Sequence, residues 1–147
     1  MAFANPSQEE IRALLIRVRT IAVVGLSPNT DRPSYRVALA LQGFGYRIIP
    51  VRPAVETVLG EKAYANLHAV PERIDLVDVF RAPEHVDEIV DECIALGLPA
   101  LWLQDGVVNE PAALRAQAAG IVVVMDRCMY RDYRRFFGAA PVGSREV

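Results

Sequence analysis

The feature that most constrains this chain is a series of five short apolar runs, separated by segments of helical periodicity. Each run is apolar at consecutive positions, which is typical of strands buried on both faces. Strands that alternate with helices form a parallel sheet covered on both sides, and right-handed crossovers make it doubly wound. We therefore predict an α/β fold: a Rossmann-like, doubly wound, mainly parallel five-stranded sheet with helices on both faces. The predicted strands cover residues 20–24, 46–51, 75–80, 100–104 and 121–125.

Capping and stop signals place the helices between these strands. The run Ser7-Gln8-Glu9-Glu10 has the spacing of a capping box, and proline or asparagine opens two later helices. We expect one domain over residues 1–147, with an N-terminal helix within residues 1–19 and a frayed tail over residues 139–147. The predicted helices run over 8–18, from the N-cap Ser34 to the stop signals Gly43 and Gly45, from Pro83 to Gly97 and from Asn109 to Ala119, with helical turns near 66–70 and over 130–137.

Charge and cysteine usage exclude several classes of protein. The 16 basic and 18 acidic residues nearly cancel, so we expect no general attraction for nucleic acid or for an anionic membrane. The two cysteines, Cys93 and Cys128, are far apart, which argues against a disulfide scaffold or a zinc site. The N-terminus lacks the pattern of a signal peptide, and no apolar run is long enough to span a bilayer. These features predict a cytoplasmic protein with reduced thiols.

The loop after the first strand is the first candidate binding element, because ligands of such sheets bind at the carboxyl ends of the strands. A helix N-terminus there attracts phosphate, and Gly25 allows a close approach of the backbone. Ser27 and Ser34 can add hydroxyl groups, and Arg32 and Arg36 can add charge. The alternative is an ordinary strand–helix turn with solvated arginines. The glycine-rich dinucleotide fingerprint is absent, which argues against a standard NAD or FAD site.

The residue after the second strand narrows the choice of ligand. NAD sites place an acidic residue there, which holds the ribose 2′-hydroxyl, whereas this chain has Arg52. A cation at this position suits an additional phosphate on the ribose, either the 2′-phosphate of NADP or the 3′-phosphate of coenzyme A. The alternative is a solvated surface arginine.

The ends of the remaining strands add side chains of other kinds. Phe80 and Arg81 can stack on an adenine, Gln104 can bond the amides of a pantetheine arm, and Gly106 permits close approach. Cys128, beside two arginines, could meet the thiol of a ligand. For Phe80 and Cys128 the alternative is plain core packing. Neither histidine lies at metal-ligand spacing from a cysteine or carboxylate, so we predict no metal site, and no catalytic dyad is visible.

Several motifs together resemble the CoA-binding domain family, which includes small stand-alone bacterial proteins and the nucleotide-binding domain of succinyl-CoA synthetase α subunits. The motifs are VVGLSPNTDRPSYRVA, IIPVRP, VLGEKAY, DLVDVFRAPE, WLQDGVVNE and VMDRCM, which span roughly residues 20–138 in order. The resemblance implies a Rossmann-like domain that binds CoA across the strand ends. It further implies that Gly25, Leu26 and Ser27 approach the phosphates, Arg52 and Pro53 lie near the adenosine end, Phe80 and Arg81 flank the adenine or the arm, and Gln104 to Gly106 follow the pantetheine.

Two departures from the family pattern refine this expectation. Stand-alone relatives commonly have asparagine at the position of Arg52 and a lysine soon after Pro53, where this chain has Ala54 and Val55. Ligase relatives use a phosphorylated histidine in a second domain, which has no counterpart here, so ligase activity by this chain alone is not expected. The resulting hypothesis is a CoA or acyl-CoA carrier, sensor or partner module without evident catalysis. The alternatives are an NADP-binding redox protein or sensor, and a thiol enzyme that uses Cys128 with CoA.

Overall fold

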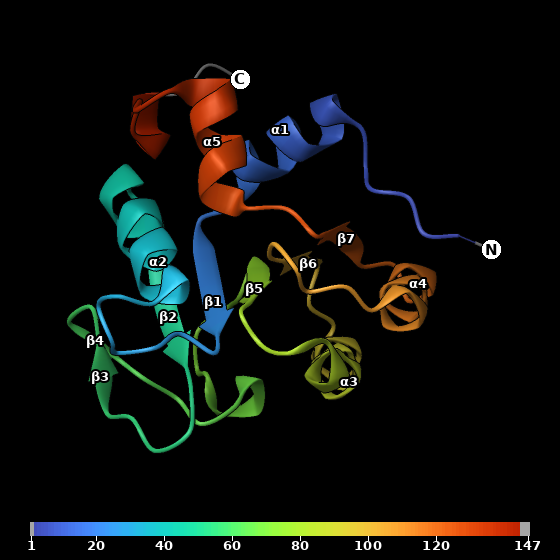
Figure 1. Ribbon diagram of the computed structural model, residues 1–147, viewed down its shortest axis with the longest axis horizontal. Coiled ribbons are helices and arrows are strands. Elements are labelled where there is room, and N and C mark those ends of the chain that lie inside the picture. Colours follow the sequence, from blue (N-terminus) through green and yellow to red (C-terminus); the bar gives the residue numbers. More distant parts are fainter. Residues whose placement is uncertain (1, 145–147) are drawn as a thin grey trace.

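Five parallel strands form one sheet in the order β2-β1-β5-β6-β7, as seen in the computed structural model, which describes residues 2–144 (Figure 1). The predicted α/β, doubly wound fold is therefore confirmed. Each predicted strand agrees with the observed one to within one residue at either end. The strands are β1 (Thr20–Val24), β2 (Arg47–Val51), β5 (Leu76–Val79), β6 (Ala100–Leu103) and β7 (Val122–Met125).

Helices cover both faces of the sheet, and β1 shows how its residues divide between them. Ile21 and Val23 belong to the hydrophobic cluster that α1, α2 and α5 cover, whereas Ala22 and Val24 belong to the cluster under α3 and α4. This division follows from the alternation of side chains along a strand, and it explains why the run is apolar at every position. The helices are α1 (Gln8–Arg17), α2 (Pro33–Phe44), α3 (Val86–Leu96), α4 (Glu110–Ala118) and α5 (Met129–Phe137).

The capping signals at Ser7 and Asn109 predicted helix starts correctly, and the one at Ser34 did not. Pro83 opens the 3₁₀ helix η2 (Pro83–His85), which α3 continues from Val86. Ser7 and Glu10 form the expected capping box of α1, and Asn109 caps α4 by accepting from the backbone N–H of Ala112. The prediction of Ser34 as the N-cap of α2 is wrong, because α2 already begins at Pro33. The N-cap is Arg32, which makes no side-chain capping bond. Proline is well suited to the first helical position, where an N–H has no partner in any case.

Of the two glycines predicted to stop α2, Gly45 does so and Gly43 does not. Gly43 lies inside the helix, which continues to Phe44 and stops at Gly45. Gly45 has a φ of +110°, in the left-handed region that favours glycine, and its backbone N–H closes the last turn.

The segment between β2 and β5 contains a hairpin that the sequence pattern did not indicate. Two short strands, β3 (Thr57–Val58) and β4 (Glu61–Lys62), pair antiparallel around Leu59 and Gly60, which both have positive φ. A turn of this kind usually has the sequence Asn-Gly or Asp-Gly. Because this turn has Leu59 before Gly60, the sequence pattern does not predict it. The predicted helical turn near residues 66–70 is present as the 3₁₀ helix η1 (Leu67–Ala69).

At both edges of the main sheet, another part of the chain bonds the carboxyl end of the edge strand. At the β7 edge, the Asn5 side chain bonds the Met125 backbone twice, through Met125 N to Oδ1 at 2.7 Å and Nδ2 to the Met125 carbonyl at 3.0 Å. At the β2 edge, the N–H of Tyr64 donates to Pro50, and its carbonyl accepts from Arg52. The position of Pro50 on an edge strand fits its lack of an N–H for a sheet ladder.

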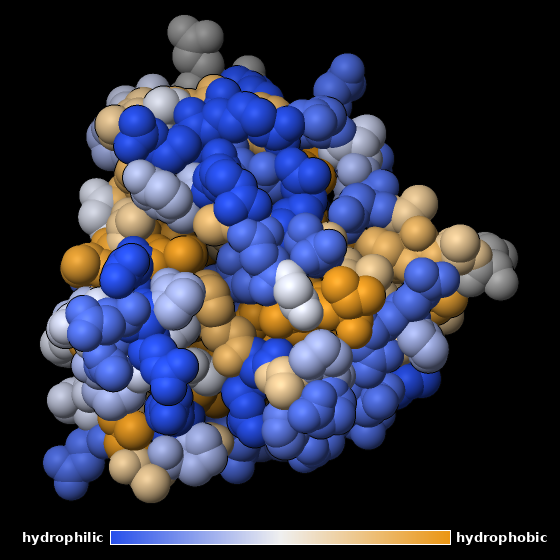
Figure 2. All heavy atoms as spheres, viewed as in Figure 1, coloured by the Kyte–Doolittle hydropathy of each residue, from blue (hydrophilic) through white to orange (hydrophobic). Residues whose placement is uncertain are grey.

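Figure 2 shows a mostly hydrophilic surface over the helices, with hydrophobic residues gathered between them. Of the segment 139–147, which was predicted to fray, Val142–Ser144 form a 3₁₀ turn and residues 145–147 lie outside the described part of the chain. Within residues 2–144, every helix is too short or too polar to cross a lipid bilayer.

Candidate functional site

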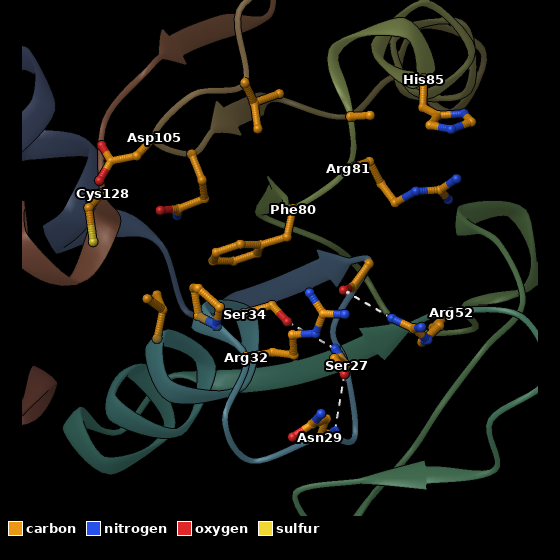
Figure 3. Close-up of a pocket in the computed structure, with 16 residues that line it drawn as sticks. Ser27, Asn29, Arg32, Ser34, Arg52, Phe80, Arg81, His85, Asp105 and Cys128 are labelled. Atoms are coloured by element: carbon orange, nitrogen blue, oxygen red, sulfur yellow. Dashed lines mark hydrogen bonds between the residues drawn. The ribbon is translucent and has the colours of Figure 1, made fainter.

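A cavity of about 770 Å³ opens at the carboxyl ends of the strands, and we call it the strand-end cavity (Figure 3). It includes the loops after β1 and β5, the two neighbouring strands between which the order of strands reverses direction. This switch point is the usual position of the ligand in such sheets. Nine residues singled out from the sequence line it: Gly25, Ser27, Arg32, Ser34, Arg52, Phe80, Arg81, Gln104 and Cys128. Asp105, which lies within the run Gln104 to Gly106 that the resemblance places along the pantetheine, also lines it. Six others that line it were not predicted: Asn29, Pro33, Val37, Ala82, His85 and Val107.

Four residues that were expected at the site lie elsewhere. Leu26 is fully buried in the core beneath α1, α2 and α5, and Arg36 is exposed on α2 without lining the cavity. Pro53 lines a neighbouring cavity of about 200 Å³, which shares Arg81 with the strand-end cavity. Gly106 is exposed, and its N–H donates to Asp126 Oδ1 at 2.8 Å, so it shapes a turn beside the site.

Gly25 lets the loops after β1 and β5 pass in contact. Its φ is +86°, and a Cβ built on it would lie 2.5 Å from the carbonyl oxygen of Phe80 and 2.9 Å from Cδ of Arg81. Any side chain there would displace the backbone that carries Phe80 and Arg81 into the cavity. The single glycine of this loop therefore serves the packing of one loop against another.

Side chains, rather than further glycines, fix the loop between β1 and α2. The hydroxyl of Ser34 accepts from the N–H of Ser27 at 3.0 Å, and the hydroxyl of Ser27 accepts from the N–H of Asn29 at 3.0 Å (Figure 3). The Asn29 side chain then accepts from the N–H of Asp31 at 2.9 Å. Three backbone donors of the loop are thus already occupied. A phosphate bound here would depend on side-chain cations more than a phosphate in a glycine-rich loop does.

The cavity carries arginines that have no acidic partner. Among residues 2–144, no carboxylate lies within ion-pair distance of Arg32, Arg52 or Arg81, and Arg52 makes one long bond, 3.5 Å, to the carbonyl of Gly25. Nearby Arg131, in contrast, holds Asp105 in a two-pronged pair at 2.8 and 2.9 Å. The guanidinium groups of Arg32, Arg52 and Arg81 are therefore available to pair with an anion.

A buried acid supports the floor of the cavity, and the sequence pattern did not indicate it. The Gln104 side-chain amide donates from Nε2 to Asp78 Oδ1 at 2.6 Å, and its Oε1 accepts from the N–H of Met129 at 3.4 Å. Asp78 is fully buried. Burial raises the pKa of its carboxyl group to about 7, although the bond from Gln104 opposes the rise. Asp78 lies inside the apolar run DLVDVF, so it looked like part of a core strand.

Residues 19–134 match the family model described as a CoA binding domain. This chain belongs to the CoA-binding domain family. The resemblance inferred from the sequence motifs is confirmed, and the match covers β1 to β7 and most of α5. In this CoA-binding domain, the loop after β1 brings Gly25 and Arg32 to the strand-end cavity.

Three related proteins match this chain over different shares of their own length. Uncharacterized protein YneT of Bacillus subtilis (strain 168) is 42% identical over 125 residues, which are 85% of this chain and 93% of YneT. A solved hypothetical protein from Pyrococcus horikoshii OT3 has 36% identity and a TM-score of 0.85, covering 92% of this chain and 98% of that one. An ADP-forming acetate–CoA ligase I of Archaeoglobus fulgidus is 27% identical over 121 residues, and the match spans 18% of the ligase.

The two sides of the cavity differ in chemistry. In Figure 3, Arg52 and Arg81 lie on one side of the view and Cys128 and Asp105 on the other, with the ring of Phe80 between them. Cys128 is half-buried at the N-cap of α5. A long ligand with an anionic end, a flat or apolar middle and a thiol or acyl end would meet a matching group along this CoA-binding domain's cavity.

Proposed function

We propose that this chain binds coenzyme A or an acyl-CoA in the strand-end cavity, as a carrier, a sensor or a partner module. The observation that carries the proposal is that Arg32, Arg52 and Arg81 line one cavity without carboxylate partners among residues 2–144. Guanidinium groups bind phosphates through paired hydrogen bonds, and a protein of net charge −2 needs such local cations to hold a polyanion. Membership of the CoA-binding domain family supports the same ligand.

The remaining lining residues suit the rest of this ligand. The ring of Phe80 offers a face for the adenine or for the apolar part of the arm. The amide of Gln104, at the floor, can bond one of the two amides of pantetheine. Both cysteines are free, which fits the reducing cytoplasm where we place the protein.

Calorimetric titration with CoA, NADP and NAD tests the proposal against its main alternative. We expect a saturable complex with CoA that weakens as salt is added, because the recognition is largely ionic. NADP shares the adenosine and an additional ribose phosphate with CoA, but it lacks the pantetheine arm. A complex with NADP and none with CoA would replace this function by that of an NADP-binding redox protein.

Removal of Arg52 is expected to show whether this residue contacts the 3′-phosphate of the ligand. Arg52→Ala should weaken CoA roughly 10- to 100-fold, the usual range for a charged hydrogen bond, and should weaken 3′-dephospho-CoA less. Arg36→Ala is the matched control, because Arg36 is an exposed arginine that does not line the cavity. We expect it to leave both affinities within about twofold, as a rim charge of this kind contributes little. Equal losses for both ligands in Arg52→Ala would reject contact with the 3′-phosphate.

Cys128 favours a second candidate function, thiol exchange with CoA, because it lines the same cavity and is half-buried rather than enclosed. In this reaction the Cys128 thiolate attacks a sulfur of CoA disulfide, a new protein–CoA disulfide forms, and CoA thiolate leaves. Mass spectrometry after incubation with CoA disulfide should show a CoA adduct on Cys128 that reductant removes. Cys93 in the same sample is the internal control, since it is fully buried. An unmodified Cys128 would reject the exchange while leaving CoA binding untouched.

A further inference from the structure

Asp78 lies in β5 at a position whose neighbours on the adjacent strands are buried core residues. It pairs in register with Val23 of β1 and Trp102 of β6, and it is fully buried. The indole N–H of Trp102 donates to the carbonyl of Arg127 at 2.8 Å, so it does not serve the carboxyl group. Asp78 Oδ2 has no hydrogen-bond partner within residues 2–144. Alternation along the strand places Phe80, which lines the cavity, on the same face one pleat further on.

This arrangement is unfavourable for stability taken alone. A buried carboxyl oxygen without a partner costs about 1–3 kcal/mol, and more if the group is charged. Replacing both members of a buried polar pair by apolar residues is often neutral or stabilising. The pair Asp78–Gln104 therefore has its use outside the stability of the core, and the side of Gln104 that faces the cavity indicates where.

The two bonds of Gln104 select one of the two orientations of its amide. The N–H of Met129 can donate only to Oε1, and this turns Nε2 toward Asp78, whose Oδ1 accepts from it at 2.6 Å. The amide keeps one further N–H and one further lone pair, and it lines the cavity with 3% of its surface exposed. A carboxamide that is held in this way presents a fixed donor and a fixed acceptor, without the entropy loss of ordering a free side chain.

We propose that Asp78 is a positioning residue for ligand binding, which fixes the Gln104 amide so that it pairs with an amide of the pantetheine arm. The inference rests on the proposed CoA function and deepens it, because it assigns recognition of the arm to a residue that does not itself reach the ligand. The same chain of bonds runs on to Met129, the first residue of α5, and so connects the floor with the helix that begins beside Cys128.

The test compares a ligand that has the arm with one that lacks it. CoA and adenosine 3′,5′-bisphosphate are titrated by calorimetry against the wild type, Asp78→Val and Gln104→Leu. Each variant should weaken CoA about tenfold, the effect of one well-made hydrogen bond, and leave adenosine 3′,5′-bisphosphate within about twofold. The double variant should lose no more than either single one, since both remove the same contact. Asp78→Asn keeps an acceptor for Nε2 and should recover most of the CoA affinity.

Controls separate positioning from general destabilisation. Leu76→Ala lies on the same strand and the same face, and it should lower stability while leaving the ratio of the two affinities unchanged. If Asp78→Val does not fold, Asp78→Ser, whose hydroxyl is too short to hold the amide, carries the same expectation. Unchanged CoA affinity in Asp78→Val or Asp78→Ser, or equal losses for both ligands, would overturn the inference. A wild type that binds no CoA would instead overturn the proposed function, and the inference with it.

Discussion

Gly25→Ala is expected to destabilise the protein by roughly 2–5 kcal/mol. A non-glycine residue at a φ of +86° costs about 1–2 kcal/mol, and overpacking a closed contact costs about 1–3 kcal/mol more. The contact is closed because the new Cβ would lie 2.5 Å from the carbonyl oxygen of Phe80, an atom of the backbone. Urea denaturation at neutral pH measures the loss, and CoA titration of the folded fraction should show weakened binding, since the Phe80–Arg81 loop must shift.

Gly106→Ala is the matched control for the steric part of this effect. Gly106 has a similar φ of +79°, but no atom lies within 4 Å of the Cβ that would be added. We therefore expect it to show only the backbone cost, about 1–2 kcal/mol. Equal losses in the two variants would mean that the approach of the two loops at Gly25 does not constrain the fold.

Asp78→Asn is expected to stabilise the protein at pH 8 by up to roughly 4 kcal/mol and to have little effect near pH 4. The pKa of this carboxyl group is about 7 in the folded chain, against an ordinary value of 3.8. Between these values the folded state holds a proton that the unfolded state has released. Stability from this group is therefore full below about pH 4, falls as the pH rises to 7 and stays low above it. Each unit of pKa difference corresponds to about 1.4 kcal/mol.

Denaturation of both proteins at pH 4.5, 6 and 8 checks this expectation. All other titrating groups are shared, so the difference between variant and wild type isolates Asp78. The advantage of the asparagine should grow with pH and level off above 7. A difference that stays constant across the three pH values would show that the buried carboxyl group does not titrate in this range.

The strands and most helices could be predicted because their signals are local. Continuous apolar runs mark strands that are buried on both faces, and Ser7 and Asn109 act on backbone groups only three residues away. Ser34 misled the prediction because a serine before a helical pattern resembles an N-cap, whereas its hydroxyl instead bonds the distant loop residue Ser27. That partner is set by the tertiary fold, which no local pattern encodes.

The position of the strand-end cavity followed from topology, but the direction of each side chain did not. Parallel strands end at one edge, so residues after each strand were expected to converge, and Arg52, Phe80 and Gln104 line one cavity. Leu26 also comes after a strand and was expected at the cavity, but its side chain is buried in the core. Asp78 was overlooked for the opposite reason, since it lies within a strand and acts on the cavity only through its neighbour.

The bonds at the carboxyl ends of both edge strands affect how another chain could add to this sheet. Asn5 occupies the backbone of Met125 on one side, and Tyr64 occupies that of Pro50 and Arg52 on the other. A strand added along the full length of either edge would first have to displace one of these contacts. A partner protein that docked on a helical face or at the mouth of the cavity would leave both contacts intact, and at the mouth a bound ligand would form part of the surface that it contacts.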